Sequence, residues 1–264
     1  MAKLIGDLRY FLDIAYKGTN FHGWQIQANA SSVQAEIEAK LALIFQKKTP
    51  IVGSGRTDTG VHAQQQMAHL DVTAPLTYFQ HIYKLNSLLP PDIAIRDAYP
   101  VNDEAHARFD AVARTYEYHI RSLKDPFSKE LAYFNHQKLD LDLMNEAAHS
   151  LLKYEDFQAF SKVKTEVNHF LCDIKKAYWE YRQEHHLVFT IVANRFLRGM
   201  VRAIVGTMLN IGTKKLNLSG FDEVIQSRDR SRAGFAVPPQ GLFLMKVAYP
   251  YPLNSIIHPS EPPL

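Results

Sequence analysis

The sequence predicts an α+β fold made of two similar halves. Stretches rich in β-branched and aromatic residues mix with amphipathic helical stretches, without the strict alternation of a doubly wound α/β sheet. The 264 residues are enough for one large domain or two modest ones. A similar mixture of predicted strands and helices follows after about residue 105. We therefore expect an N-terminal half over residues 1–105, a C-terminal half over residues 106–249 and a Pro-rich, extended tail over residues 250–264.

In the first half, residues 9–16 are predicted to form a strand because they are rich in β-forming residues. Residues 31–47 are predicted to form a helix, since Ser31 and Gln34 fit a capping box and apolar residues follow at helical spacing. Short strands are expected over residues 50–52, 67–72 and 93–98. A helix over residues 77–89 is expected to stop at two prolines.

In the second half, residues 112–121 alternate as a strand does, which puts Arg114, Tyr116 and Tyr118 on one face. The other expected elements are a helix over 141–152, a strand pair over 175–181 and 187–193, helices over 196–211 and 221–227, and a last strand over 242–249.

Composition and charge limit the possible classes of protein. The formal net charge of +3 permits an anionic partner without requiring one. With Cys172 as the one cysteine, no intrachain disulfide is possible and a cysteine-based metal site is nearly excluded, which fits a reducing cytosol. The His62/His69 and His185/His186 pairs have no Glu-x-x-His or Cys partner, so we expect no metal. The early charges do not suit a signal peptide, and the apolar run at residues 200–211 is too short for a bilayer.

The stretch VGSGRTDTGVHA, residues 52–63, looks at first like a phosphate-binding loop. A Walker A loop would place Lys and Ser or Thr after Gly60, but Val and His follow it. A dinucleotide fingerprint starting at Gly53 would have its third glycine at Asp58, where a carboxylate repels pyrophosphate. Two interpretations stay open: the loop presents the Asp58 carboxylate, or Asp58 caps its own backbone in an Asx-turn.

Three arginines share a narrow strip of the predicted helix over residues 196–211 and its start, at spacing i, i+3 and i+7: Arg195, Arg198 and Arg202. Small residues beside the strip favour close packing: Gly199, Ala203 and Gly206. A buried guanidinium needs an anion. Arg202 is therefore expected to pair either with a structural carboxylate or with Asp58.

Two further stretches have alternative interpretations. Residues 16–27 form a Gly-punctuated loop whose aromatic residues suit stacking with single-stranded RNA, or else an ordinary turn around a core Trp. Residues 106–110, with Arg114, add positive charge before the strand of Tyr116, or else form a solvated charged segment.

Taken in order over about residues 10–250, these stretches closely resemble the TruA family of tRNA pseudouridine synthases. The matching segments are residues 16–27, 56–63, 86–90, 106–118, 144–160, 196–212 and 241–244. The resemblance implies a cofactor-free isomerase that converts uridine to pseudouridine at positions 38, 39 and 40 of the tRNA anticodon stem-loop. It also implies two α+β halves whose mainly antiparallel sheets join around a central cleft, and a cytoplasmic homodimer that binds tRNA and needs no metal or nucleotide.

The resemblance also assigns roles to residues. Asp58 matches the essential carboxylate, Arg202 the arginine paired with it, and Tyr116 the tyrosine packed on the target base. The expected substrate-binding residues are Tyr116, Arg56, which helps hold the flipped nucleotide, Leu242, which lines the pocket, and His62 and Arg108 in the matched segments.

The chain departs from the family pattern at two places. Thr59 stands where Ala is usual, and residues 233–239 lack the usual Pro-Thr-Ala run before two prolines. A synthase acting on other RNA sites and a non-catalytic RNA-binding relative therefore remain alternatives, while the missing Lys disfavours a nucleotide-dependent enzyme.

Overall fold

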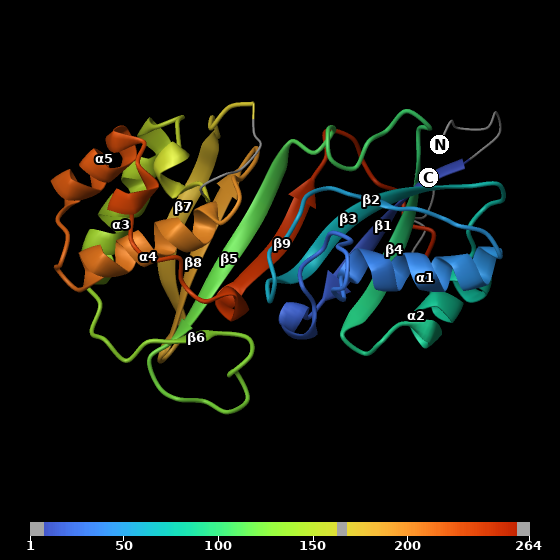
Figure 1. Cartoon of the computed structure of the whole chain (residues 1–264), viewed down its shortest axis with the longest axis horizontal. Coiled ribbons are helices and arrows are strands. Elements are labelled where there is room, and N and C mark those ends of the chain that lie inside the picture. The colour runs from blue at the N-terminus through green and yellow to red at the C-terminus, as the bar shows by residue number, and fades with distance from the viewer. Residues whose placement is uncertain (1–7, 163–167, 258–264) are drawn as a thin grey trace, which may run out of the picture. The chain divides into compact units, whose positions relative to one another are not determined.

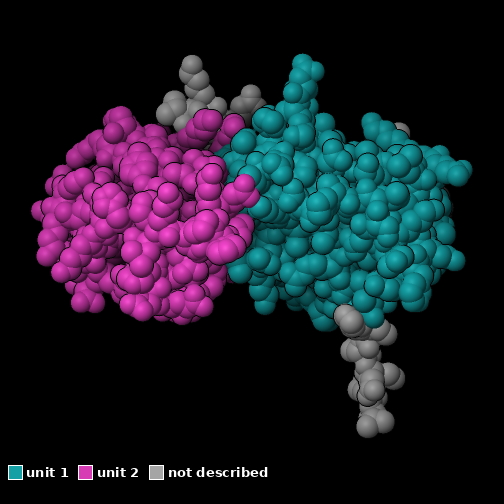
Figure 2. Space-filling view, turned by 90° about the horizontal axis from the view of Figure 1, so that it is seen from below, with its two compact units in different colours: residues 1–112, 244–264 teal, residues 113–243 magenta. Residues whose placement is uncertain are grey.

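The computed structural model describes residues 8–162 and 168–257. The chain divides into two compact units, shown in different colours in Figure 2. Unit 1 comprises Met1–Val112 and Leu244–Leu264, and unit 2 comprises Ala113–Phe243. The domain boundary expected at residue 105 and the cleft between two halves stay predictions.

Unit 1 is built on antiparallel strands with helices on one face (Figure 1). Its elements are β1 (Leu8–Tyr16), α1 (Val33–Phe45), β2 (Val52–Gly53), β3 (His62–Val72), α2 (Lys84–Leu88), β4 (Ile93–Val101) and the greater part of β9 (Leu242–Ala248). The strand order is β4-β1-β3-β9, and β2 pairs with β3. Leu12 and Leu70 of the strands face Leu41 of α1 and Leu85 of α2, so this apolar layer joins helices to sheet.

The start of α1 is fixed by Ser32 and not by Ser31, so the expected capping residue is wrong by one position. The Ser32 side chain accepts a hydrogen bond from the Ala35 N–H at 3.3 Å. Ser31 instead donates its hydroxyl to the Asn20 carbonyl at 3.2 Å. The Gln34 Oε1 atom accepts from the Ile26 N–H at 3.4 Å, so it does not make the capping-box bond to the cap residue.

Unit 2 contains a second set of strands with its own helices. Its elements are β5 (Ala113–Arg121), β6 (Tyr133–Phe134), α3 (Leu141–Ser150), β7 (Ile174–Gln183), β8 (His186–Ala193), α4 (Met200–Gly212) and α5 (Leu218–Ser227). The strand order is β5-β8-β7 with antiparallel pairing, and the short β6 pairs with β5 in parallel. Helix α4 is almost entirely buried. The mixture of mainly antiparallel strands and helices confirms the α+β class.

Helix α4 begins at Met200, four residues later than expected. Gly199 adopts a left-handed backbone with φ of +73°, and the Arg198 carbonyl accepts a hydrogen bond from the Lys162 N–H. Arg195 and Arg198 therefore lie before the helix, and the prediction that three arginines share one helical strip is wrong. Of the three, Arg202 alone lies on α4.

Other elements have different bounds from those predicted from the sequence. Strand β3 starts at His62, five residues earlier than expected, so the loop of interest is shorter than the sequence indicates. The helix expected over residues 77–89 is a π-helical turn, Tyr78–Tyr83, followed by α2. In the tail, the Ile256 N–H donates to the Ala98 carbonyl of β4, and residues 258–264 lie outside the described residues. Within the described part of the chain, no helix combines the length and apolar character needed to cross a membrane.

Candidate active site

The loop between β2 and β3 carries Asp58, and its backbone is held on both sides of that residue. The Thr57 carbonyl accepts a hydrogen bond from the Trp24 N–H at 3.3 Å, and the Asp58 carbonyl accepts one from the Val61 N–H at 3.1 Å. The Gly60 N–H donates to the Phe21 carbonyl at 3.3 Å. The segment that resembled an RNA-stacking loop therefore lies against the Asp58 loop and holds it in place.

This close approach requires a glycine at position 23. Gly23 has φ of +89°, and a Cβ atom there would lie 2.4 Å from the Thr57 carbonyl oxygen. Glycine reaches this backbone region without strain and leaves room for the neighbouring chain. The Asp58 loop thus depends on a backbone-to-backbone contact between segments more than thirty residues apart in sequence.

The rings of the 16–27 segment are mostly inside unit 1. Trp24 is 2% exposed and Phe21 is 6% exposed, so for these two residues the interpretation as a turn around a core Trp is supported. The Trp24 ring packs on Gly53, where a Cβ atom would lie 2.5 Å from the indole nitrogen. These two rings are buried next to the Asp58 loop and are not available to stack on bases.

His62 is the first residue of β3, directly after the loop. It is 1% exposed, and its Nδ1 atom accepts a hydrogen bond from the Gly18 N–H at 3.0 Å. This bond requires the neutral tautomer with the proton on Nε2. The geometry fits a part in holding the loop better than direct contact with a substrate.

The first half of the loop is held by a buried amide. Gln66 is fully buried; its Oε1 accepts from the Ser54 hydroxyl at 2.6 Å and its Nε2 donates to the Gly55 carbonyl at 2.8 Å. Arg56, between this anchor and the one at Thr57, is exposed, and Asp58, directly after Thr57, is half-buried. The loop therefore presents an arginine and a carboxylate at its surface while the residue between them points inward.

In unit 2, Arg202 is held by the segment that departs from the family pattern. Its Nε donates to the Val237 carbonyl at 2.7 Å, and its own carbonyl accepts from the Val237 N–H at 3.2 Å. One turn further along α4, a Cβ atom at Gly206 would lie 1.8 Å from the Phe235 carbonyl oxygen. The expectation that small residues let this helix pack closely is confirmed for Gly206.

Tyr116 is half-buried on β5 and makes an edge-to-face contact with Phe196, with ring centroids 5.0 Å apart and an interplanar angle of 81°. The sequence interpretation gave Phe196 no role beyond a place in a helix. No local pattern marks its contact with Tyr116, because the two residues lie 80 positions apart in the sequence. Leu242, at the start of β9, is 6% exposed.

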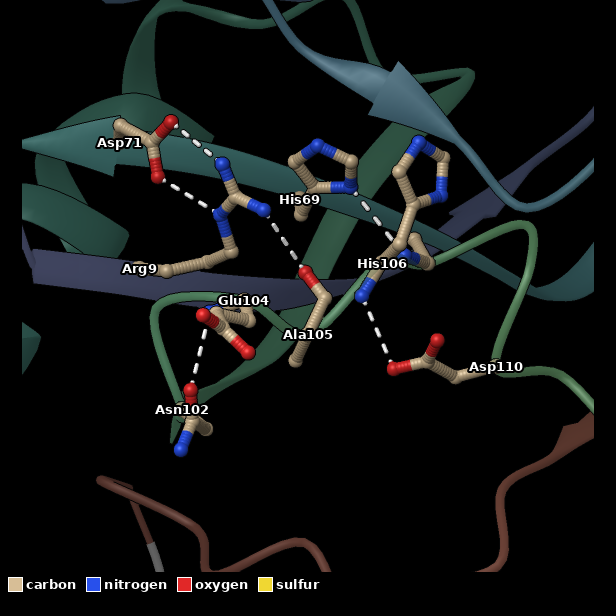
Figure 3. Close-up of polar contacts among 9 residues, drawn as sticks. Arg9, His69, Asp71, Asn102, Glu104, Ala105, His106 and Asp110 are labelled. Atoms are coloured by element: carbon tan, nitrogen blue, oxygen red, sulfur yellow. Dashed lines mark hydrogen bonds and ion pairs between the residues drawn. The ribbon is translucent and has the colours of Figure 1, made fainter. Parts of the chain in front are cut away.

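Arg108 is an exposed residue of a turn over residues 102–110. Figure 3 shows the polar network that ties this turn to the sheet of unit 1. Arg9 on β1 forms a two-pronged ion pair with Asp71 on β3, at 2.8 Å for each bond, and donates a third bond to the Ala105 carbonyl at 2.9 Å. The bonds to Asp71 raise the pKa of Arg9, so this anchor stays charged. Sequence reasoning missed Arg9 because nothing in its spacing marks a partner 62 residues away.

Two histidines complete this network. His69 accepts a hydrogen bond from the Ala107 N–H at its Nδ1, and burial lowers the pKa of His69 to about 4, so the ring is neutral. The Asp110 carboxylate accepts from the His106 N–H at 2.9 Å, a bond that lowers the pKa of Asp110. Arg108 and Phe109 are left exposed at the tip of this fixed turn, with the guanidinium 5.6 Å from the Phe109 ring centroid.

The structure thus places Asp58 and Arg56 on one loop of unit 1, with His62 at the start of the strand that follows it. It places Arg108 on another turn of that unit, and Tyr116, Arg202 and Leu242 in or at the edge of unit 2. The pairing of Asp58 with Arg202 joins residues of different units and stays a prediction. Among the described residues, no cluster of three or more His, Cys, Asp or Glu side chains could hold a metal ion.

Comparison with known proteins identifies the family. The family model described as tRNA pseudouridine synthase matches residues 14–110 and 147–250. The chain is 50% identical to a tRNA pseudouridine synthase A of Parabacteroides distasonis over 244 residues, which cover 92% of this chain and 96% of that protein. It is 47% identical to the protein of the same name from Bacteroides fragilis over 243 residues, with 92% and 96% covered. A more distant relative of that name from Exiguobacterium is 36% identical over 241 residues, with 91% and 98% covered.

The chain therefore belongs to the tRNA pseudouridine synthase family, a family of isomerases. This confirms the resemblance drawn from the motifs, and with it the expected class of enzyme and fold. The matched ranges include the Asp58 loop, the Arg108 turn and helix α4, but not Tyr116 on β5.

Proposed function

We propose that this protein isomerises uridine to pseudouridine at positions 38, 39 and 40 of the tRNA anticodon stem-loop, with Asp58 as the essential carboxylate. The observation that carries the proposal is the loop between β2 and β3, whose backbone is held on both sides of Asp58 while Asp58 itself stays half-buried. The names of the relatives supply the tRNA substrate. The protein acts as a cytoplasmic homodimer, as the resemblance implies.

The reaction needs a positioned carboxylate more than a cofactor. The N1–C1′ bond of the uridine breaks, the base turns, and a C5–C1′ bond forms, while C5 loses a proton and N1 gains one. Asp58 either attacks C1′ or removes the 2′ proton. Arg202 stands as its counter-charge, since a nearby cation favours the ionised carboxylate, and Tyr116 stacks on the base and accepts the C5 proton directly or through water.

The target uridine must leave the base stack before it reacts. In this proposal Arg56 holds the flipped nucleotide and Arg108 contacts a phosphate, and the exposure of both residues supports these roles. Leu242 lines the pocket, and His62 supports the loop from behind. Because phosphate contacts supply much of the affinity, we expect tRNA binding to weaken as salt rises.

The decisive test is Asp58→Asn, which keeps the shape of the side chain and removes its charge. Purified variant protein should bind unmodified tRNA with wild-type affinity and form no pseudouridine. Asp142→Asn is a matched control, since Asp142 is an exposed carboxylate in the first turn of α3. Full turnover by Asp58→Asn contradicts the assignment.

Mapping pseudouridine in tRNA from cells with and without the protein tests the sites. Loss at positions 38–40 supports the proposal. Loss at other positions favours a synthase with different RNA sites, which the exposed Thr59 and the half-exposed Phe235 at the two departures would fit. No change in any RNA favours a non-catalytic relative.

A further inference from the structure

Tyr16 reaches the Asp58 loop because of an irregularity in the sheet. In the pairing of β1 with β3, Ile14 lies opposite Gln66 but Tyr16 lies opposite Ala63. Two steps along β1 thus span three along β3, which is the signature of a β-bulge with one extra residue on β3. Such a bulge turns the following side chain, and here Tyr16 ends β1 beside the loop, at 4% exposure.

The Tyr16 hydroxyl lies 2.8 Å from the Thr57 Oγ1 atom, and both groups are buried. Thr57 is the residue directly before Asp58, and its carbonyl is already bonded to the Trp24 N–H. Thr57 is therefore fixed through its side chain and through its backbone. Arg56 and Asp58 on either side are more exposed, so the direction of the Asp58 side chain depends on how firmly Thr57 is held.

We propose that Tyr16 is a positioning residue for Asp58 and acts through the hydroxyl of Thr57. The inference rests on the proposed function of Asp58 as the essential carboxylate. A carboxylate that must approach C1′ or the 2′ position works only within a narrow range of geometry, and a misplacement of about 1 Å can reduce rates on the order of 100-fold.

The test is Tyr16→Phe, which removes one oxygen atom and keeps the ring. We expect kcat on unmodified tRNA to fall at least tenfold, while KM changes by less than about twofold, because loop alignment matters to the reaction more than to tRNA affinity. Tyr10→Phe is the matched control on the same strand. Its ring is 6% exposed and its hydroxyl accepts a bond from the Leu76 N–H at 3.3 Å, away from the loop, so its kcat should stay at the wild-type value.

Variants of the partner residue separate positioning from general loss of structure. Thr57→Val keeps the shape and removes the hydroxyl, so it should lower kcat as Tyr16→Phe does, and the double variant should be no slower than either single one. Thr57→Ser keeps the oxygen and should retain most of the rate. Equal losses of kcat in Tyr10→Phe and Tyr16→Phe, or additive losses in the double variant, contradict the inference.

The two proposals fail in different ways. Wild-type protein that forms no pseudouridine in any tRNA contradicts the proposed function, and the inference falls with it. Active wild-type protein with an unchanged kcat in Tyr16→Phe contradicts the inference alone.

Discussion

Gly206 on helix α4 is the position where one added methyl group should have the largest effect. A Cβ atom there would lie 1.8 Å from the Phe235 carbonyl oxygen, and this oxygen belongs to the backbone and cannot rotate away. Non-bonded carbon and oxygen atoms need about 3.4 Å, so in Gly206→Ala the segment of Phe235 must move by roughly 1.5 Å. That movement also affects the two hydrogen bonds between Val237 and Arg202, two residues further along.

The size of the effect follows from three contributions. Overpacking of a close contact costs about 1–3 kcal/mol, and each lost hydrogen bond costs about 1 kcal/mol. Alanine within a helix gains back about 1 kcal/mol relative to glycine. The expected net loss in the free energy of unfolding is about 2–4 kcal/mol, which lowers Tm by roughly 10 °C for a chain of this size.

Gly212→Ala provides the matched control on the same helix. A Cβ atom at Gly212 would lie 2.5 Å from the Met144 sulfur and 3.1 Å from the Leu139 Cδ2, which are the ends of flexible side chains. Thermal unfolding followed by circular dichroism should therefore give a Tm for Gly212→Ala within a few degrees of wild type. A Gly206→Ala protein as stable as Gly212→Ala would refute the close approach of the 233–237 segment to α4.

Two further predictions concern unit 1. Asp13 is buried, its Oδ1 has no hydrogen-bond partner among the described residues, and burial raises its pKa above 3.8 despite a bond from Gln65. The folded state therefore favours the protonated form of Asp13 more than the unfolded chain does, and the free energy of unfolding falls as pH rises through the folded-state pKa. Asp13→Asn should raise the free energy of unfolding at pH 7 and leave it unchanged near pH 3. An equal gain at both pH values in urea unfolding would contradict this. Gly23→Ala should lower Tm and kcat, because Gly23 has a positive φ and a Cβ atom there would lie 2.4 Å from the Thr57 carbonyl oxygen. Gly55→Ala is the control and should keep the wild-type Tm, since nothing lies within 4 Å of its Cβ position. Similar Tm values for the two variants would contradict the contact that holds the Asp58 loop.

Sequence reasoning was most successful where the signal is local. The alternation along residues 112–121 marks β5, and the failure of the 52–63 stretch to fit either phosphate-binding pattern directs attention to Asp58. Both depend on neighbours within a few residues. The structure confirms the strand as β5, because this segment keeps its local preference in the folded chain, while the role of Asp58 stays a prediction.

The errors arise where a distant segment decides the local structure. Residues 196–199 have helical spacing, but Lys162 bonds to the Arg198 carbonyl and Gly199 takes a left-handed conformation, so α4 starts later. Ser31 and Ser32 are equally good caps by residue type, and the contact of Ser31 with Asn20 decides between them. No periodicity within a window of residues contains that information.

The departure at residues 233–239 lies in the segment that holds Arg202. The Val237 carbonyl and N–H that bond to Arg202 are backbone groups, as is the Phe235 carbonyl that lies over Gly206. Any residue at 235 or 237 supplies the carbonyl, and any residue but proline at 237 also supplies the N–H, so the replacement of a Pro-Thr-Ala run leaves the anchor of Arg202 intact. What the departure changes is the side chain of Phe235, which is 53% exposed beside that anchor. We therefore expect Phe235→Thr to alter the preference among tRNA substrates, measured as ratios of kcat/KM, while leaving the Tm unchanged.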